Sequence, residues 1–392
     1  MRGPEEIIFF SYMILLLFWL LAGLQSIACL YYGFTLYAAR RFFRQPWPAQ
    51  TSLPPVTLLK PLKGASAETY EHLASFCRLD YPTFQMLCGV RDPSDPAIAV
   101  VQRLQKDFPQ RDIVLVVNPE VLGANYKVST LHHLSHLAKH DIFVITDSDV
   151  SVAPECLRRI IPLLADPHTG LVTCLYRGGA VTPFFARLES LLINTGFAAM
   201  ILVAAQIEKT TYAFGAAMAV KRQALDQIGG FLALADYLAD DYHLGNLVSH
   251  AGYTVRIAPH VVETHPSVAS CKELWRHQLR WARTQRICRA GGYFGTLIIY
   301  GTVWALLGVL FFPSSIAMWQ LALMTIGLRL YTTSVISDVF LDAAVTRRYL
   351  WLVPLTDILS FVIWCASLRG NTVHWGEYTF RVQRDGKMVR VG

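Results

Sequence analysis

The stretch IFVITDSDVS, residues 142–151, joins an apolar run to a pair of carboxylates. The run Ile142–Thr146 is β-branched and apolar and predicts a buried strand, and Asp147 and Asp149 follow it one residue apart. Carboxylates without thiolates or an imidazole cluster suit a hard cation such as Mg²⁺ or Mn²⁺, which completes its shell with phosphate and water. The stretch therefore predicts a strand that ends at a metal-bound diphosphate. The alternative is an ordinary strand-ending turn, since Asp and Ser favour turns.

Apolar runs alternate with amphipathic stretches in the sequence that leads to this strand. The expected strands are residues 56–64, 84–92, 112–117 and 141–149, and the expected helices are residues 66–77, 95–108 and 125–140. Strands that alternate with helices in this way predict an α/β layer with a largely parallel sheet.

In a parallel sheet, ligands bind beyond the carboxyl ends of the strands. The polar side chains expected at those ends, or at the start of the next helix, are Lys60, Lys63, Asp92, Lys127, Asp147 and Asp149. We expect them to gather at one rim of the sheet. The sequence contains neither G-x-G-x-x-G nor G-x-x-x-x-G-K-[ST], so a bound phosphate would not be cradled by a glycine loop.

The composition indicates a membrane protein, because 53% of the 392 residues are hydrophobic and 16% are charged. Residues 7–39 carry no charged side chain, and about 20 apolar residues are enough to span a bilayer. This run is longer than a signal-peptide core and predicts a retained anchor over residues 1–44. The runs Thr296–Phe312, Ile316–Phe340 and Tyr349–Ser367 predict further membrane helices within residues 293–370.

The charges that flank these runs predict an orientation in the membrane. Acidic side chains precede the first run and basic ones follow it: Glu5, Glu6, Arg40, Arg41 and Arg44. The positive-inside rule then places residues 50–292, which follow a proline-rich linker at residues 45–55, in the cytoplasm, and Arg347 and Arg348 agree. Strict alternation of the spans would put the tail, residues 371–392, outside; an interfacial last segment is the alternative.

The net charge is +7, and much of it lies near the apolar runs. This distribution favours anionic lipid headgroups over nucleic acid as a partner. No nucleic-acid-binding motif is present in the sequence. The eight cysteines show no C-x-x-C or zinc-finger spacing, which indicates reduced structural thiols.

Two later segments add candidate functional groups. YLADDYHLG, residues 237–245, contains Asp240 and Asp241, and adjacent aspartates commonly cap a helix. KELWRHQLRWARTQRICR, residues 272–289, predicts a helix with arginines at three- and four-residue spacing. Such a helix is typical of an anionic membrane surface, but Arg280 and Trp281 could turn inward, where a guanidinium neutralises phosphate.

Two other patterns receive a structural interpretation. His132, His136 and His140 fall on one face of an expected helix, where a solvated face is favoured over a metal site. The apolar stretch Ile193–Ala205 is short for a span and predicts a buried or membrane-dipping helix.

In their order along the chain, these segments resemble the processive-type glycosyltransferases of families 2 and 21, above all the ceramide glucosyltransferase group. The matching segments are LLKPLKG, LDYPTFQMLCGVRDPSDPA, GANYKVSTL, ITDSDV, YAFGAAMAVKR, IGGF, LADDYHLG and HQLRW. They cover about residues 50–300. Within that group, ALADYLADDYHLG and LWRHQLRWART are most similar to the bacterial hopanoid-biosynthesis glycosyltransferases.

The resemblance implies a GT-A fold, that is, a Rossmann-like α/β domain, with N-terminal and C-terminal transmembrane helices. It also implies a nucleotide-sugar donor, inversion at the sugar carbon, and Mg²⁺ or Mn²⁺ held by Asp149 with the help of Asp147. Asp241 would be the general base, and Asp92 would contact the uridine. The remaining donor-binding residues would be Lys60, Lys127, Asp147, Gly215, Asp240, Arg280 and Trp281. His277 departs from the family, which has Gln or Arg at that position.

The implied reaction moves N-acetylglucosamine or glucose from a UDP-sugar to a lipid hydroxyl. A hopanoid such as bacteriohopanetetrol is the favoured acceptor and ceramide the alternative, in a bacterial inner (plasma) membrane with the catalytic domain facing the cytoplasm. A haloacid-type phosphatase with Asp147 as its nucleophile is one alternative from another class, but it leaves Asp92 and Arg280 without a role. A non-enzymatic membrane scaffold or transporter is the other, and the few polar residues inside the apolar runs argue against transport.

Overall fold

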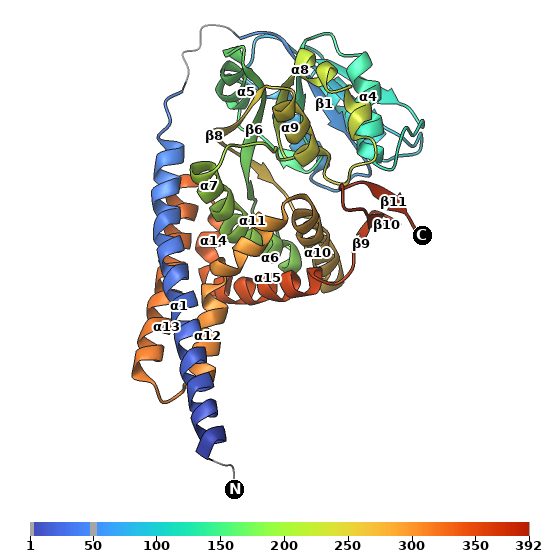
Figure 1. Ribbon diagram of the computed structural model, residues 1–392. Coiled ribbons are helices and arrows are strands. Elements are labelled where there is room, and N and C mark those ends of the chain that lie inside the picture. Colours follow the sequence, from blue (N-terminus) through green and yellow to red (C-terminus); the bar gives the residue numbers. More distant parts are fainter. Residues whose placement is uncertain (1–3, 48–52, 392) are drawn as a thin grey trace.

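The computed structural model describes residues 4–47 and 53–391 (Figure 1). Residues 48–52, the middle of the expected proline-rich linker, lie outside the described residues. A sheet with helices packed around it forms one end of the protein, and a group of long helices extends away from it (Figure 1).

Eight strands form one mixed sheet in the order β3-β2-β1-β4-β7-β6-β8-β5. The strands are β1 (Val56–Pro61), β2 (Phe84–Val90), β3 (Asp112–Val117), β4 (Ile142–Ile145), β5 (Val150–Ser151), β6 (Thr169–Gly178), β7 (Met218–Lys221) and β8 (Thr254–Thr264). Strands β1 to β4 pair in parallel, as do β6 and β8, whereas β7 is antiparallel to both β4 and β6. The predicted α/β fold with a largely parallel sheet is confirmed, with β7 antiparallel near its centre and β5 antiparallel to β8 at its edge.

The helices of the sheet region are α2 (Thr69–Cys77), α3 (Ala97–Asp107), α4 (Tyr126–His136), α5 (Cys156–Ile160), η1 (Ile161–Ala165), α8 (Arg222–Gln227), η3 (Phe231–Leu234) and α9 (Asp240–His250). Asn125 begins α4, because its side chain accepts a hydrogen bond from the Val128 amide at 3.1 Å. This cap fixes the first turn of α4, which carries Lys127, against the end of the sheet.

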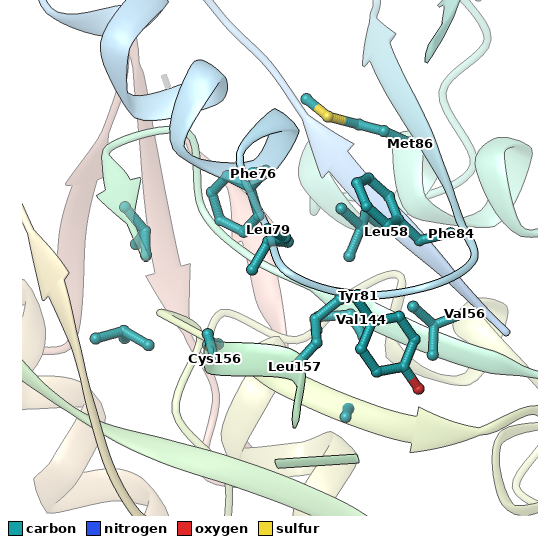
Figure 2. Packing of buried hydrophobic residues seen from close by; sticks show 14 of the residues in the cluster. Val56, Leu58, Phe76, Leu79, Tyr81, Phe84, Met86, Val144, Cys156 and Leu157 are labelled. Atoms are coloured by element: carbon teal, nitrogen blue, oxygen red, sulfur yellow. The ribbon is translucent and has the colours of Figure 1, made fainter. Parts of the chain in front are cut away.

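Buried apolar side chains cover both faces of the sheet. Leu58, Met86 and Val144 pack on one face, where Figure 2 shows Phe76 and Leu79 among their neighbours. On the other face, Leu59, Leu87, Phe143 and Ile145 pack against α4 and η3. Successive residues of a strand point to opposite faces of the sheet. When both faces are covered, the sequence of each strand is therefore apolar throughout. That is why residues 142–146 predict β4 so directly.

The remaining elements form the helical part and the tail. They are α1 (Pro4–Phe43), α6 (Phe184–Leu192), η2 (Ile193–Phe197), α7 (Ala198–Ile207), α10 (Cys271–Cys288), α11 (Ala290–Gly295), η4 (Thr296–Ile299), α12 (Gly301–Phe311), α13 (Ile316–Val335), η5 (Ile336–Phe340), α14 (Ala344–Arg348), η6 (Leu350–Leu352), α15 (Val353–Ser367), β9 (Thr372–Trp375), β10 (Tyr378–Val382) and β11 (Met388–Arg390). Helices α1, α12 and α13 run alongside one another, and α15 runs roughly perpendicular to them, from α12 to a position beneath α6 and α10 (Figure 1).

Among the described residues, three helical segments are long and apolar enough to cross a membrane: Ile8–Phe43, Phe184–Ile207 and Leu350–Ser367. The pair Ala290–Ile299 and Gly301–Phe311, bent by 52°, makes a fourth if counted as one broken span. The predicted apolar helices at the N-terminus and in the C-terminal region are thus present. The predicted span Ile316–Phe340 is helical but is not among them, since α13 includes polar side chains such as Gln320 and Arg329.

The segment Phe184–Ile207 agrees with the expectation of a buried helix, because 61% of its most apolar 18-residue stretch is buried inside the protein. It is longer than the predicted stretch Ile193–Ala205, since α6 leads into α7 through the π-helical turn η2 without a break.

The C-terminal tail returns to the sheet. The Met388 amide donates to the Asp236 carbonyl at 2.7 Å, and Tyr237 pairs with Lys387 as an isolated β-bridge. The tail therefore lies on the same side as the sheet, and the expectation from strict alternation is wrong. The physical reason is that α15 runs across the other long helices, so the chain leaves it close to α10.

A buried ion pair joins the long helices. Arg329 of α13 and Asp357 of α15 have side chains that are 8% and 7% exposed, with Nη2 and Oδ1 2.7 Å apart. Arg329 also donates to the Thr195 carbonyl at 3.1 Å, and Asp357 accepts from the Thr302 hydroxyl at 2.6 Å. The pair therefore ties α13 and α15 to α12 and η2.

We expect Arg329→Met to destabilise the protein by about 3–5 kcal/mol, because it leaves the Asp357 carboxylate buried without its charge partner. The double variant Arg329→Met/Asp357→Leu should recover most of this loss, since apolar residues often replace a buried pair at little cost. Thermal unfolding in detergent measures both. Equal destabilisation of the single and double variants would show that the unpaired Asp357 carboxylate is not the cause of the lost stability.

Candidate active site

A cavity of about 1140 Å³ lies where the carboxyl edge of the sheet meets the helical part. Its polar wall includes Lys63, Asp92, Lys127, Asp149, Asp241 and Arg280, and its apolar wall includes Tyr31 of α1, Met200, Ile201 and Ile207 of α7, and Ile298 and Ile299 of η4. One continuous space therefore joins a charged rim to a surface built from apolar helices.

All of the predicted site residues except Lys60 line this cavity. Lys60 is fully buried, and its Nζ donates to the Thr146 hydroxyl at 2.6 Å and to the Asp147 carbonyl at 2.9 Å. The prediction that Lys60 touches the donor is therefore corrected. Lys60 shares its side of β1 with Leu58, so it points to Phe76 of α2, with Nζ 3.8 Å from the ring centroid. Burial lowers the pKa of Lys60 to about 7. Its visible role is to hold the end of β4.

Lys127 lies between two of the carboxylates. Its Nζ is 2.7 Å from Asp147 Oδ1 and 3.2 Å from Asp240 Oδ2. Burial alone would lower the pKa of Lys127, but the charges of Asp147 and Asp240 outweigh it and raise the pKa above its usual value. Lys127 thus stays charged and fixes the position of Asp147 relative to the start of α9.

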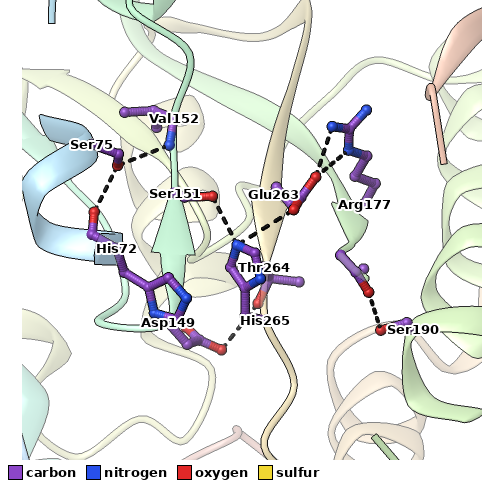
Figure 3. A network of polar contacts seen from close by, with 12 residues as sticks. His72, Ser75, Asp149, Ser151, Val152, Arg177, Ser190, Glu263, Thr264 and His265 are labelled. Atoms are coloured by element: carbon purple, nitrogen blue, oxygen red, sulfur yellow. Dashed lines mark hydrogen bonds and ion pairs between the residues drawn. The ribbon is translucent and has the colours of Figure 1, made fainter. Parts of the chain in front are cut away.

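Asp149, the second carboxylate of the Asp-x-Asp pair, lies beside Thr264 of β8 (Figure 3). Its Oδ2 accepts a hydrogen bond from the Thr264 hydroxyl at 3.0 Å. Burial raises the pKa of Asp149, and the nearby charge of Asp147 raises it further. A bound cation would offset both effects.

The donor set of this pair fits Mg²⁺ or Mn²⁺. Within the described ranges, no group of three or more His, Cys, Asp or Glu side chains could hold a metal ion. The protein would therefore supply the two carboxylates of Asp147 and Asp149, and phosphate and water would supply the remaining oxygens, as is usual for Mg²⁺. His132 and His136 have their Nε2 atoms 3.2 Å apart on the surface, and they belong to no such group.

Asp241 lies in the first turn of α9, and both of its carboxylate oxygens are held by the backbone. Oδ2 accepts from the Gly215 amide at 2.7 Å, and Oδ1 accepts from the Tyr242 amide at 2.8 Å. A Cβ on Gly215 would lie 3.1 Å from Asp147 Oδ2 and 3.3 Å from Asp241 Oδ2. Gly215 thus lets the two carboxylates approach the same part of the cavity. Burial, followed by the charge of Asp240, raises the pKa of Asp241 to about 6.

Asp92 lies at the outer part of the rim, beyond the end of β2. It accepts hydrogen bonds from the Ser94 amide at 2.8 Å and from the Ser94 hydroxyl at 2.7 Å, which lower its pKa. Asp92 is therefore ionised and held by a local turn, with Lys63 and Arg91 also on the cavity wall.

Arg280 brings an unpaired positive charge to the cavity. Among the described residues its guanidinium has no hydrogen-bond or ion-pair partner, and it lies 5.9 Å from the ring centroid of Trp375 in the tail. Burial lowers the pKa of Arg280, while Glu189 and Asp147 oppose this effect. A half-buried guanidinium without a protein partner is suited to bind an anion such as phosphate.

Most of the other arginines in the series at residues 272–289 bind groups of the protein itself. Arg283 donates to the Thr372 and Arg369 carbonyls, and Arg286 donates to the Gly370 carbonyl. Arg289 pairs with Glu208. Only Arg276 of this series is exposed, because α10 packs between α6, α15 and the tail.

Sequence reasoning missed side chains that reach the cavity from α6 and from the tail. Glu189 of α6 is the single acidic residue in the mostly apolar stretch FFARLESLLIN, and its presence there was the feature of the sequence that could have identified it. Trp375 and Tyr378 reach the cavity from the tail, whose sequence carries no motif for this role.

Comparison with known proteins identifies the family. The family described as Glycosyl transferase family 21 matches residues 20–388. The chain belongs to glycosyl transferase family 21. This membership agrees with the sequence resemblance, and it disfavours both the phosphatase and the scaffold alternatives.

Curated relatives of this family 21 chain include glycolipid synthases. Ceramide glucosyltransferase 3 of Caenorhabditis elegans is 26% identical over 238 residues, which is 59% of this chain and 51% of the relative. The beta-monoglucosyldiacylglycerol synthase of Synechocystis sp. is 24% identical over 245 residues, which is 61% of this chain and 48% of the relative. The chain thus spans about half the length of these curated relatives.

Among solved structures, a mannosyltransferase from Pyrobaculum calidifontis in complex with GDP-Man and Mn²⁺ has a similar fold. Its TM-score is 0.50 at 20% sequence identity, covering 87% of this chain and 99% of that one. The family 21 chain therefore shares a GT-A-like architecture with it.

Proposed function

We propose that this family 21 chain is an inverting, metal-dependent glycosyltransferase that moves a hexose from a UDP-sugar to a membrane lipid. The observation that carries the proposal is the single cavity that joins the carboxylates at the sheet edge to the apolar wall of α1, α7 and η4. A polar donor and a lipid hydroxyl can meet only where such surfaces share one space.

The polar end supplies the contacts that a nucleotide diphosphate needs. We assign Asp92 to the uridine and Arg280 to the diphosphate, because the Arg280 guanidinium has no hydrogen-bond or ion-pair partner within residues 4–47 and 53–391. Asp149 and Asp147 would hold Mg²⁺ or Mn²⁺, which when bound neutralises charge on the leaving diphosphate. Lys127 and Asp240 keep Asp147 in place, and Trp281 adds an apolar wall.

Asp241 is the proposed general base. The backbone amides of Gly215 and Tyr242 orient its carboxylate toward the part of the cavity that Asp147 also reaches. It would take the proton from the acceptor hydroxyl while that oxygen attacks the sugar carbon opposite the leaving diphosphate. Direct attack inverts the sugar carbon and requires no second nucleophilic carboxylate.

The apolar end suits a lipid acceptor. Tyr31 belongs to the candidate span Ile8–Phe43, and Ile298 and Ile299 belong to the bent pair, so this end of the cavity would open at the membrane. A hopanoid such as bacteriohopanetetrol is the proposed acceptor, in a bacterial inner membrane with the sheet on the cytoplasmic side. Ceramide is the alternative, as the names of several relatives suggest.

The purified protein, incubated with Mg²⁺ or Mn²⁺, tests the proposal. The donors would be UDP-glucose, UDP-N-acetylglucosamine and GDP-mannose, and the acceptors a hopanoid polyol, ceramide and diacylglycerol, with products identified by mass spectrometry. We expect a hexosyl-lipid from a UDP-sugar and the hopanoid. Transfer from GDP-mannose alone would contradict the donor assignment, and absence of any glycolipid would contradict the reaction.

The rate of transfer should depend on pH through Asp241. A general base works only when deprotonated, and burial raises the pKa of Asp241 to about 6 from its usual value near 4. We expect kcat/KM to fall about tenfold per pH unit below that pKa and to level off above it. Initial rates from about pH 5 to about pH 8, with stability checked at each pH, measure the profile. An acid limb that begins near pH 4 would contradict the raised pKa.

A further inference from the structure

Glu189 is a buried carboxylate with one oxygen left without a partner. Its side chain is 1% exposed, and Oε1 lies 2.6 Å from His277 Nδ1 and accepts a hydrogen bond from Gln278 Nε2 at 2.9 Å. Oε2 is buried and has no hydrogen-bond partner within residues 4–47 and 53–391. Two donors of α10 thus hold one oxygen and leave the other free.

Such an arrangement is costly unless a ligand completes it. An unsatisfied buried polar group costs about 1–3 kcal/mol, and more when it is charged. Both Glu189 and His277 line the cavity, so a ligand inside it can approach the free oxygen. A carboxylate oxygen accepts hydrogen bonds, and the donors that the proposed substrates offer are hydroxyl groups.

The position of His277 on α10 indicates which part of the substrate carries the hydroxyl that meets Glu189. His277, Arg280 and Trp281 are spaced three and four residues apart, so they share one face of the helix. His277, the α10 side chain next to Glu189, therefore lies about 4.5 Å along the helix from Arg280, the group assigned to the diphosphate. The donor hexose is attached directly to that diphosphate. The rings of His277 and Trp281, with centroids 4.5 Å apart, add an aromatic wall beside it.

We propose that Glu189, held by His277 and Gln278, recognises the transferred hexose by accepting a hydrogen bond from one of its hydroxyl groups. This inference rests on the proposed function and adds a sugar-specificity residue to it. His277, at the position where the resembling family has Gln or Arg, is here a positioning residue that donates to Glu189 and leaves its second oxygen for the sugar.

Binding to the full-length protein in detergent with Mg²⁺, without any acceptor, tests the inference. We expect Glu189→Gln to bind UDP within about twofold of the parent protein and to bind the UDP-hexose about 10- to 100-fold more weakly, since losing a hydrogen bond to a charged group costs about 1.5–3 kcal/mol. Glu189→Asp keeps the negative charge, but its shorter side chain places the carboxylate farther from the cavity. It should therefore also weaken UDP-hexose binding while leaving UDP binding unchanged. Glu71→Gln, an exposed glutamate of α2, is the matched control and should change neither affinity.

Each other result has a defined meaning. Equal weakening of UDP and UDP-hexose would overturn the inference in favour of a structural role, as would failure of both Glu189 variants to fold. Unchanged UDP-hexose binding would also overturn it. If the parent protein binds neither UDP nor a UDP-hexose, the proposed function itself fails, which is a distinct outcome.

Discussion

Asp241→Asn should slow sugar transfer by ~10²–10⁴-fold, the usual contribution of a positioned general base. Asn preserves the shape of the side chain and its carbonyl oxygen still accepts a backbone hydrogen bond, so the fold at the start of α9 should survive. What the variant removes is the ability to take a proton from the acceptor hydroxyl. The measurement is the single-turnover rate of glycolipid formation at saturating donor.

Two readouts separate this base from a residue that only shapes the site. Donor affinity should stay close to that of the parent protein, and the acid limb of the pH profile should disappear. Asp226→Asn is the matched control, because Asp226 is exposed on α8 and does not line the cavity. Transfer by Asp241→Asn at the parent rate would contradict the assignment.

The strands that build the rim were predictable because apolar runs bounded by polar residues define them locally. Residues 142–145 form β4 as the run predicts, and β1, β2 and β3 follow the same rule. Their carboxyl ends converge because parallel strands share one direction, so Asp92, Asp147 and Asp149 could be grouped without coordinates. The side to which Lys60 points could not be predicted in this way, because it depends on which face of β1 packs against α2.

The remainder of the site depends on packing between segments far apart in the sequence. Glu189 gains its importance only because α10 packs on α6, so that His277 and Gln278 reach one oxygen and not the other. In the same way, Trp375 reaches the cavity because α15 runs across the bundle and directs the tail back. No local pattern encodes either arrangement, since both depend on the angles between helices.

Asp149→Asn is expected to lower the rate of sugar transfer without lowering the stability of the metal-free protein. Asp147 already pairs with Lys127, whereas the Asp149 side chain has no ion-pair partner among the described residues, so Asp149 is the carboxylate that is free to ligate a cation. Losing that ligand removes several kcal/mol of transition-state charge stabilisation, which corresponds to a loss of about 10²-fold or more in rate. Transfer rates at increasing Mn²⁺ concentration, and the effect of a chelator on the parent protein, measure this.

The stability of the metal-free protein decides between a metal ligand and an ordinary turn residue. Burial and Asp147 raise the folded-state pKa of Asp149, so stability present at low pH is lost as the pH rises through that pKa and the carboxylate ionises. Asn cannot ionise and can still accept from Thr264, so the metal-free variant should melt no lower than the metal-free parent at neutral pH. Only the parent should gain stability when Mn²⁺ and UDP are added. A metal-free variant that melts well below the parent would instead show that Asp149 holds the turn after β4, and the metal site would have to lie elsewhere.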